Sequence, residues 1–186
     1  MKQIRHNIFE TNSSSTHSVS LTNMSSDIPN FEQLDSYVDP ADHYIHIGFG
    51  EFGWGYNEYV DAYTKLQYLL TMILETNKCD FGKPIGIKSI EEFYLCDDFI
   101  LLESIITEHV KDCKGINIID PDIKLNVCEI EGTDEVIQYV THNGYIDHQS
   151  CENYNCLADF LNDFETTIED FVFNENVMLL IDSDNN

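Results

Sequence analysis

In the segment YVDAYTKLQYLLTMILETN, residues 59–77, large apolar side chains recur every three or four positions. The recurring residues are Tyr59, Tyr63, Leu66, Leu70 and Ile73. This spacing places them on one stripe of an α-helix, as in a helix that packs against a hydrophobic core. We therefore predict a buried helical stripe that ends near Asn77.

Two further helical regions are predicted after this segment. The first follows Ser89, which can cap a helix, and continues beyond a break near Asp97 and Asp98 until Gly115 stops it. Its apolar stripe is Phe99, Leu102, Ile106 and Val110. The second region is outlined by Leu157, Phe160, Leu161, Phe164, Ile168 and Phe171. By contrast, the polar segment 25–42 contains two prolines and is predicted to be irregular.

Short stretches of alternating or apolar residues predict strands on both sides of the helices. They are QIRHNIF (3–9), THSVSLTN (16–23), HYIHIGFG (43–50), INIID (116–120), IKLNVCEI (123–130) and VMLLI (177–181). The first two are predicted to pair antiparallel. In residues 137–148, IQYVTHNGYIDH, the pair Asn143-Gly144 predicts a hairpin turn. The chain is therefore expected to be one α+β domain, residues 1–186, with an antiparallel sheet of several strands packed with about three helices.

Negative charge is the strongest compositional signal. The chain has 34 acidic and 9 basic residues and a formal net charge of −25. Residues 1–88 contain six basic and eleven acidic residues, whereas residues 89–186 contain three and twenty-three. Direct binding to DNA or RNA needs a positively charged protein, and binding to an anionic membrane surface needs one as well. The charge instead favours a strongly basic protein partner; the alternative is that the acids only maintain solubility.

The chain start and the cysteines indicate a location. The start MKQIRHNIF lacks the apolar core of a secretory signal, and no uninterrupted apolar run of about 18 residues occurs in the sequence. We therefore expect a cytoplasmic protein with its six cysteines reduced. None of them forms a CxxC pair. They are expected to act as small apolar fillers, with Cys96 and Cys128 in apolar stretches.

A serine-rich stretch, FETNSSSTHS, occupies residues 9–18. Its side chains either satisfy backbone groups in a turn or form an anion-binding nest with His17 as donor or proton carrier. Further along, GYIDHQS, residues 144–150, places Asp147 beside His148. Either residue can complete a proton-transfer set with His17 and a loop serine, or both only decorate the end of a hairpin. If the protein is an enzyme, the candidate catalytic residues are Ser14, His17, Asp147 and His148.

Two other motifs have weaker implications. His142, His148, Cys151 and Cys156 are ligand types that suit zinc, but their spacing matches no standard knuckle, so we expect no metal and no cofactor. The segment GFGEFGWGY, residues 48–56, is rich in glycine but no lysine follows it, so it is not a phosphate loop. It resembles a tight aromatic corner. If exposed, Phe52, Trp54 and Tyr56 can anchor a partner.

The motifs RHNIFETNSSSTHS (5–18), EFGW (51–54) and GYIDHQS (144–150) together resemble a signature of small proteins, of no accepted activity, encoded by Firmicutes and their phages. The resemblance implies one pocket built from Asn12, Ser13, Ser14, Ser15, His17, Trp54, Asp147 and His148. In size and charge alone, the chain is similar to phage anti-CRISPR proteins and anti-restriction DNA mimics. That similarity implies acidic groups on a rigid surface that occupy a channel evolved for phosphates and pair with its Arg and Lys residues.

Three functions follow as hypotheses. The leading one is a phage or mobile-element anti-defence protein that inhibits a nucleic-acid-handling enzyme, of CRISPR-Cas or restriction type, as an acidic mimic. Its contact surface is expected within residues 89–186, chiefly at Glu129, Glu131, Asp134, Glu135, Asp159, Asp163, Glu165, Glu169 and Asp170. The alternative is a small enzyme or ligand-binding protein that uses the Ser/His/Asp pocket. A third possibility is a structural or scaffolding partner with neither property.

Overall fold

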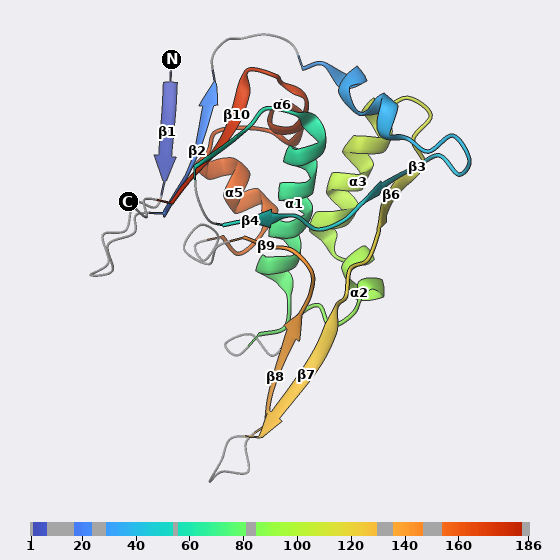
Figure 1. Ribbon diagram of the computed structural model, residues 1–186, viewed down its shortest axis with the longest axis vertical. Helices are drawn as coiled ribbons and strands as arrows, with labels where there is room; N and C mark the ends of the chain where they lie inside the picture. Colours follow the sequence, from blue (N-terminus) through green and yellow to red (C-terminus); the bar gives the residue numbers. More distant parts are fainter. Residues whose placement is uncertain are drawn as a thin grey trace.

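The computed structural model describes residues 2–6, 17–23, 29–53, 56–80, 85–129, 136–146 and 154–183, and every structural statement below concerns these residues. Helices and strands both contribute to the fold, and three of the four sheets in the described residues have only two strands (Figure 1). The prediction of an α+β protein is therefore confirmed.

The predicted helix of residues 59–77 is the centre of the structure. It is α1, Ala62–Asn77, and it begins where the side chain of Asp61 accepts a hydrogen bond from the N–H of Thr64 at 2.8 Å. The prediction that Tyr59 belongs to the helical stripe is wrong, because Tyr59 ends a short strand before the helix. Leu66, Leu70 and Ile73 are fully buried, as predicted. Residues on the other faces of α1 are also buried, because η1, α3, α5, α6 and β9 all pack against it (Figure 1).

A four-stranded antiparallel sheet holds the two ends of the described chain together. Its strand order is β1 (Lys2–His6), β2 (His17–Asn23), β10 (Val177–Ser183) and β5 (Asn57–Tyr59). The predicted pairing of the first two strands is confirmed, with Ile4 opposite Leu21. The apolar strand near the end of the chain, β10, lies between β2 and β5.

Two short strand pairs are parallel, which the sequence did not reveal. β3 (Tyr44–Ile47) pairs with β6 (Gly115–Ile118), and β4 (Glu51–Phe52) pairs with β9 (Tyr145–Ile146). In β3 and β6 the four isoleucines are buried, whereas the residues between them point away from the core.

The predicted hairpin around Asn143-Gly144 is wrong. β8 (Val136–Thr141) instead pairs antiparallel with β7 (Lys124–Glu129), and together they form a ribbon that projects from the helices (Figure 1). Gly144, with a φ of 75°, redirects the chain so that β9 reaches β4. Cys128 is exposed on this ribbon, so its predicted role as a buried filler is also wrong.

The remaining helices are α2 (Ile90–Tyr94), α3 (Asp97–His109), α5 (Leu157–Asp163), α6 (Ile168–Phe173) and the 3₁₀ helix η1 (Phe31–Tyr37). Ser89 caps α2, since its hydroxyl accepts from the N–H of Glu92. The apolar stripe of α3 is buried as predicted. α3 ends at His109, however, and Gly115 starts β6 instead of stopping the helix. η1 corrects the prediction that residues 25–42 are irregular throughout.

The last helical region is split in two, because Glu165 has a φ of 49° between α5 and α6. None of the helices in the described part of the chain combines the length and the apolar character needed to span a bilayer.

Candidate functional site

Most residues of the predicted serine–histidine pocket lie outside the described residues. These are Asn12, Ser13, Ser14, Ser15, Trp54, Asp147 and His148. His17 is the first residue of β2, where its backbone pairs with that of Ser183. The pocket therefore stays a prediction.

The predicted acidic contact residues that the structure describes lie in two separate places. Glu129 is exposed at the end of β7, on the projecting ribbon, while Glu131, Asp134 and Glu135 lie outside the described residues. The other predicted acids belong to α5 and α6 or to the turn between them, on the body of the protein (Figure 1). They are Asp159, Asp163, Glu165, Glu169 and Asp170. Asp159 also has a local role, because it accepts hydrogen bonds from the backbone and side chain of Asn155.

His142, considered above as a zinc ligand, belongs to a different group. Its side chain is 2% exposed, and its Nε2 lies 3.1 Å from Oε1 of Glu75, whose other oxygen lies 2.6 Å from Nζ of Lys78. Burial opposes ionisation of Glu75, but the hydrogen bond with His142 and the charge of Lys78 outweigh it and lower the pKa of Glu75. Cys156 lies elsewhere, at the start of α5. Within the described residues, no group of three or more possible metal ligands contains both described members of the His/Cys set considered above, His142 and Cys156.

The aromatic residues of segment 48–56, considered above as anchors for a partner, differ in their exposure. Phe52 is buried in the core, so it cannot anchor a partner, whereas Tyr56 is exposed. Trp54 lies outside the described residues.

An exposed surface that is both acidic and apolar lies on α2 and α3. We call it the α2–α3 surface, and its exposed acidic and apolar residues are Glu91, Glu92, Leu95, Asp97, Ile100, Leu101 and Glu108. Leu95 is 75% exposed. Residues 89–110 contain no lysine or arginine. Within the described part of the chain, neither Asp97 nor Glu108 forms an ion pair, so no basic side chain neutralises their charge.

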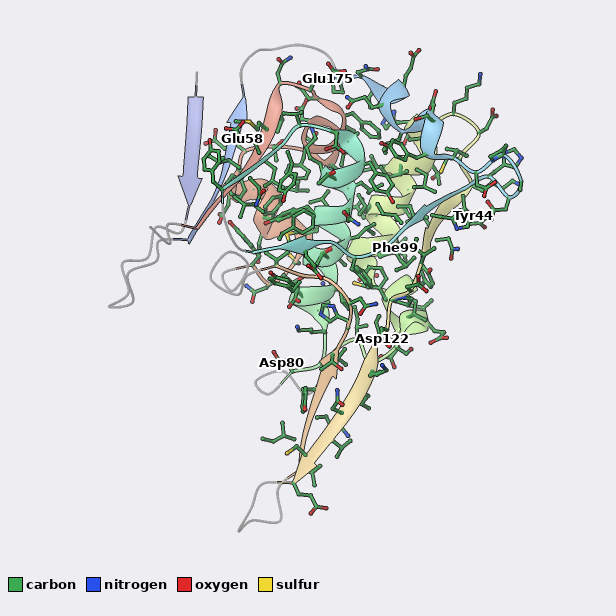
Figure 2. The ribbon with its side chains drawn as sticks, in the orientation of Figure 1. Tyr44, Glu58, Asp80, Phe99, Asp122 and Glu175 are labelled. Atoms are coloured by element: carbon green, nitrogen blue, oxygen red, sulfur yellow. The ribbon has the colours of Figure 1, made fainter. Side chains whose placement is uncertain are left out.

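A cleft of about 440 Å³ adjoins this surface, between α2–α3 and the β3–β6 pair. It is lined by Asp42, Tyr44, Tyr94, Phe99, Glu103, Ile116 and Asn117. Figure 2 shows Tyr44 and Phe99 on the same side of the molecule, beside these strands. The volume falls within the range of small-ligand sites. The lining combines aromatic rings with carboxylates and contains no lysine or arginine.

Side chains from α2 and α3 build the inner wall of the cleft. Oε1 of Glu103 accepts the N–H of Ile116 at 2.9 Å, and the hydroxyl of Tyr94 accepts the N–H of Ile118 at 2.9 Å. These bonds satisfy donors along β6 that β3 does not use. Burial raises the pKa of Tyr94, and the negative charge of Glu103 raises it further, although the bond from Ile118 opposes this.

The outer rim of the cleft is a hydrogen-bonded chain from Asp42 through His46 to Asn117. His46 and Asn117 are partners in the parallel register, so their side chains lie on the same face. Nδ2 of Asn117 lies 2.9 Å from Nδ1 of His46, and Nε2 of His46 lies 3.0 Å from Oδ2 of Asp42. With the hydroxyl of Tyr94 directed at Oδ1 of Asn117, the amide nitrogen faces His46. Nε2 then carries the ring proton, and both ring nitrogens are occupied.

Asp42 is a carboxylate fixed by its neighbours. The N–H of Tyr44 donates to its Oδ1 at 3.0 Å. That bond and the interaction with His46 hold the pKa of Asp42 below its ordinary value. Asp39, Asp42 and His46 also bring one ligand atom each within 4.8 Å of one another. His46 already bonds Asp42 through the nitrogen that faces these acids, and the group is largely exposed, so we assign no metal to it.

Comparisons with protein-family models, curated proteins and solved structures find no match to this chain. The predicted similarity to Firmicutes and phage proteins is therefore neither supported nor contradicted by them.

None of the residues that line the cleft was predicted from the sequence as a site residue. The available signal was the alternation in β3 and β6, which places Tyr44, His46 and Asn117 on the outward faces of two predicted strands. That alternation does not show which strands are neighbours. It also does not show which helix covers the edge of the strands.

Proposed function

We propose that this protein is an anti-defence protein of a phage or mobile element. It acts in the host cytoplasm and inhibits a nucleic-acid-handling enzyme of CRISPR-Cas or restriction type. It does so by occupying the basic nucleic-acid channel of that enzyme as an acidic mimic, without binding nucleic acid or a membrane itself.

The observation that carries this proposal is the run of exposed carboxylates on the α2–α3 surface, which has no lysine or arginine among them. Its carboxylates are exposed, and neither lysine nor arginine occurs between positions 89 and 110. A channel that binds phosphates presents Arg and Lys side chains, which form charge-assisted hydrogen bonds equally well with carboxylates. The same charges repel nucleic acid, which agrees with a protein partner.

The apolar residues of the α2–α3 surface support a specific contact. Leu95, Ile100 and Leu101 lie among the carboxylates and can be buried when a partner docks. Charge then steers the encounter and selects the partner, while burial of these side chains contributes affinity. The acids of α5 and α6 on the body, and separately Glu129 at the end of β7, provide further contacts in this proposal.

The proposal predicts inhibition that competes with nucleic acid. We expect the purified protein to inhibit one or more nucleases in a panel of RNA-guided and restriction enzymes, at a ratio near one inhibitor per enzyme. Raising the concentration of guide RNA or target DNA should relieve the inhibition, because both ligands use the same basic channel. The measurement is the initial cleavage rate over a matrix of inhibitor and nucleic-acid concentrations.

Inhibition that does not change with nucleic-acid concentration would contradict the channel-mimic mechanism. Inactivation of many enzyme molecules by one molecule of this protein would contradict binding and favour the enzymatic alternative. Ser14→Ala and His17→Ala are the matched variants for that outcome, because only the enzymatic alternative requires these side chains.

A further inference from the structure

The cleft between α2–α3 and β3–β6 has a chemical character that the acidic surface alone does not explain. Its walls are aromatic at Tyr44, Tyr94 and Phe99, and its charged groups are the carboxylates of Asp42 and Glu103. Flat aromatic faces beside carboxylates favour organic cations, which bind by stacking, by cation–π attraction and by charge-assisted hydrogen bonds.

A carboxylate and a ring from the lining of the cleft converge beside Gly115. A Cβ atom placed on Gly115 would lie 2.6 Å from Oε1 of Glu103 and 3.0 Å from Cε1 of Tyr44. The absence of a side chain at Gly115 therefore leaves the space in which these two groups meet. Tyr44 is 37% exposed, so the ring remains accessible from solvent.

Glu103 has one oxygen available for a ligand. Its Oε1 bonds the N–H of Ile116, and within the described residues Oε2 has no hydrogen-bond donor and no cationic partner. Asp42 is held ionised at the rim. His46 and Asn117 are occupied with each other, so the cleft offers fixed acceptors and no free ring nitrogen for proton transfer.

We propose that this cleft binds a guanidinium group, with Glu103 as the acceptor, Tyr44 as the stacking face and Asp42 as the carboxylate at the rim. A guanidinium is planar and carries several N–H donors, so it can stack on a ring while it donates to a carboxylate beside that ring. An ammonium lacks the flat face. The cleft therefore binds arginine in preference to lysine.

Two sources can supply this group. An arginine side chain of the basic partner is the source that we favour, and this part of the inference rests on the proposed function. The other source is a free guanidine compound. The guanidinium site itself is tested without any partner, so its failure and the failure of the proposed function can be told apart.

The test is titration of the ¹⁵N-labelled full chain with three small probes, followed by amide chemical shifts. The probes are arginine blocked at both ends, lysine blocked in the same way, and blocked citrulline, which has nearly the shape of arginine but is neutral. We expect saturable shifts at Gly115, Ile116 and Asn117 with blocked arginine, at a Kd of about 1 mM or tighter. Blocked lysine should bind at least about threefold more weakly, and citrulline should not saturate.

Two variants separate the cleft from general acidity. Glu103→Gln keeps an acceptor for Ile116 but removes the charge, and it should weaken blocked arginine at least about fivefold. Tyr44→Leu removes the stacking face and should weaken it about threefold. Glu51→Gln removes an exposed charge outside the cleft and should leave the Kd unchanged. Equal weakening by Glu51→Gln and Glu103→Gln would overturn the site, and so would equal affinity for citrulline.

A fourth probe, methylguanidine, distinguishes the sources. Tighter binding of blocked arginine than of methylguanidine supports an arginine side chain, because the aliphatic stem and blocked ends then add contacts. Tighter binding of methylguanidine supports a free guanidine compound, and it overturns the assignment to the partner's arginine. Absence of saturable binding by both overturns the guanidinium site.

Discussion

Reversing three charges on the α2–α3 surface should weaken inhibition of the target nuclease by at least about 100-fold. The variant is Glu91→Lys with Asp97→Lys and Glu108→Lys. Each carboxylate that faces a basic channel becomes a repulsive charge, and about 1 kcal/mol per reversal gives roughly 3 kcal/mol in total. The measurement is the inhibition constant at fixed nuclease, nucleic acid and salt.

The matched control changes the net charge by the same amount on the other half of the chain. Glu32→Lys, Glu51→Lys and Glu58→Lys also replace exposed acids. This control should change the inhibition constant by less than about fivefold. Asp97 lies in the first turn of α3, where a lysine is unfavourable, so far-UV circular dichroism of both variants must first show an intact fold. Equal losses in the two variants would mean that total charge matters and the α2–α3 surface does not.

The second large effect concerns Lys65, a fully buried lysine on α1. Its Nζ donates to the carbonyl oxygens of Asn174 at 2.9 Å and Val177 at 3.1 Å, which joins α1 to the segment between α6 and β10. Burial lowers the pKa of Lys65 from 10.5 to about 8, although the charges of Asp61 and Glu175 oppose this. Keeping this lysine charged at neutral pH therefore costs the folded protein free energy.

The free energy of unfolding should accordingly depend on pH through Lys65. The unfolded chain holds this proton up to about pH 10.5, whereas the folded chain releases it near pH 8. Stability therefore rises with pH between these values, because the unfolded state binds more protons there. Relative to Lys65→Met, the natural protein should gain about 2 kcal/mol between pH 7 and about pH 9.5 and almost nothing below pH 7.

The comparison with Lys65→Met is essential because other groups titrate in the same range. Burial raises the pKa of the Cys96 and Cys113 thiols, which removes stability at alkaline pH, but both proteins share this loss. Urea unfolding at a series of pH values gives the difference. Lys111→Met, at an exposed lysine, should follow the natural protein at every pH. A constant difference between Lys65→Met and the natural protein would show that Lys65 ionises normally in the fold.

Local features of the fold were predictable from the sequence. The stripe of Leu66, Leu70 and Ile73 predicted a buried helix, and Ser89 was predicted as a helix cap. Both features were predictable because each depends only on residues a few positions apart. The pairing of the first two strands was predictable for the same reason, since they are close in the chain. The alternation of Tyr44 to Ile47 similarly predicted β3.

Long-range pairing was not predictable, and the cleft depends on it. His46 and Asn117 are 71 positions apart and meet only because β3 and β6 are parallel neighbours. The same limit explains the wrong hairpin at Gly144, where a strong turn signal was outweighed by the pairing of β9 with β4. The partners of individual acids were also not predictable: nothing in the sequence showed that Asp159 would bond Asn155 while Asp97 and Glu108 stay without an ion pair in the described structure.

The dependence of affinity on salt tests most directly the claim that the protein binds a basic channel through exposed carboxylates. The measurement is the Kd for the inhibited nuclease in a series of NaCl concentrations. We predict that the Kd rises at least about tenfold between about 50 and 200 mM NaCl, because salt screens exposed charges over a distance near 10 Å. A Kd that stays constant over this range would contradict acidic mimicry.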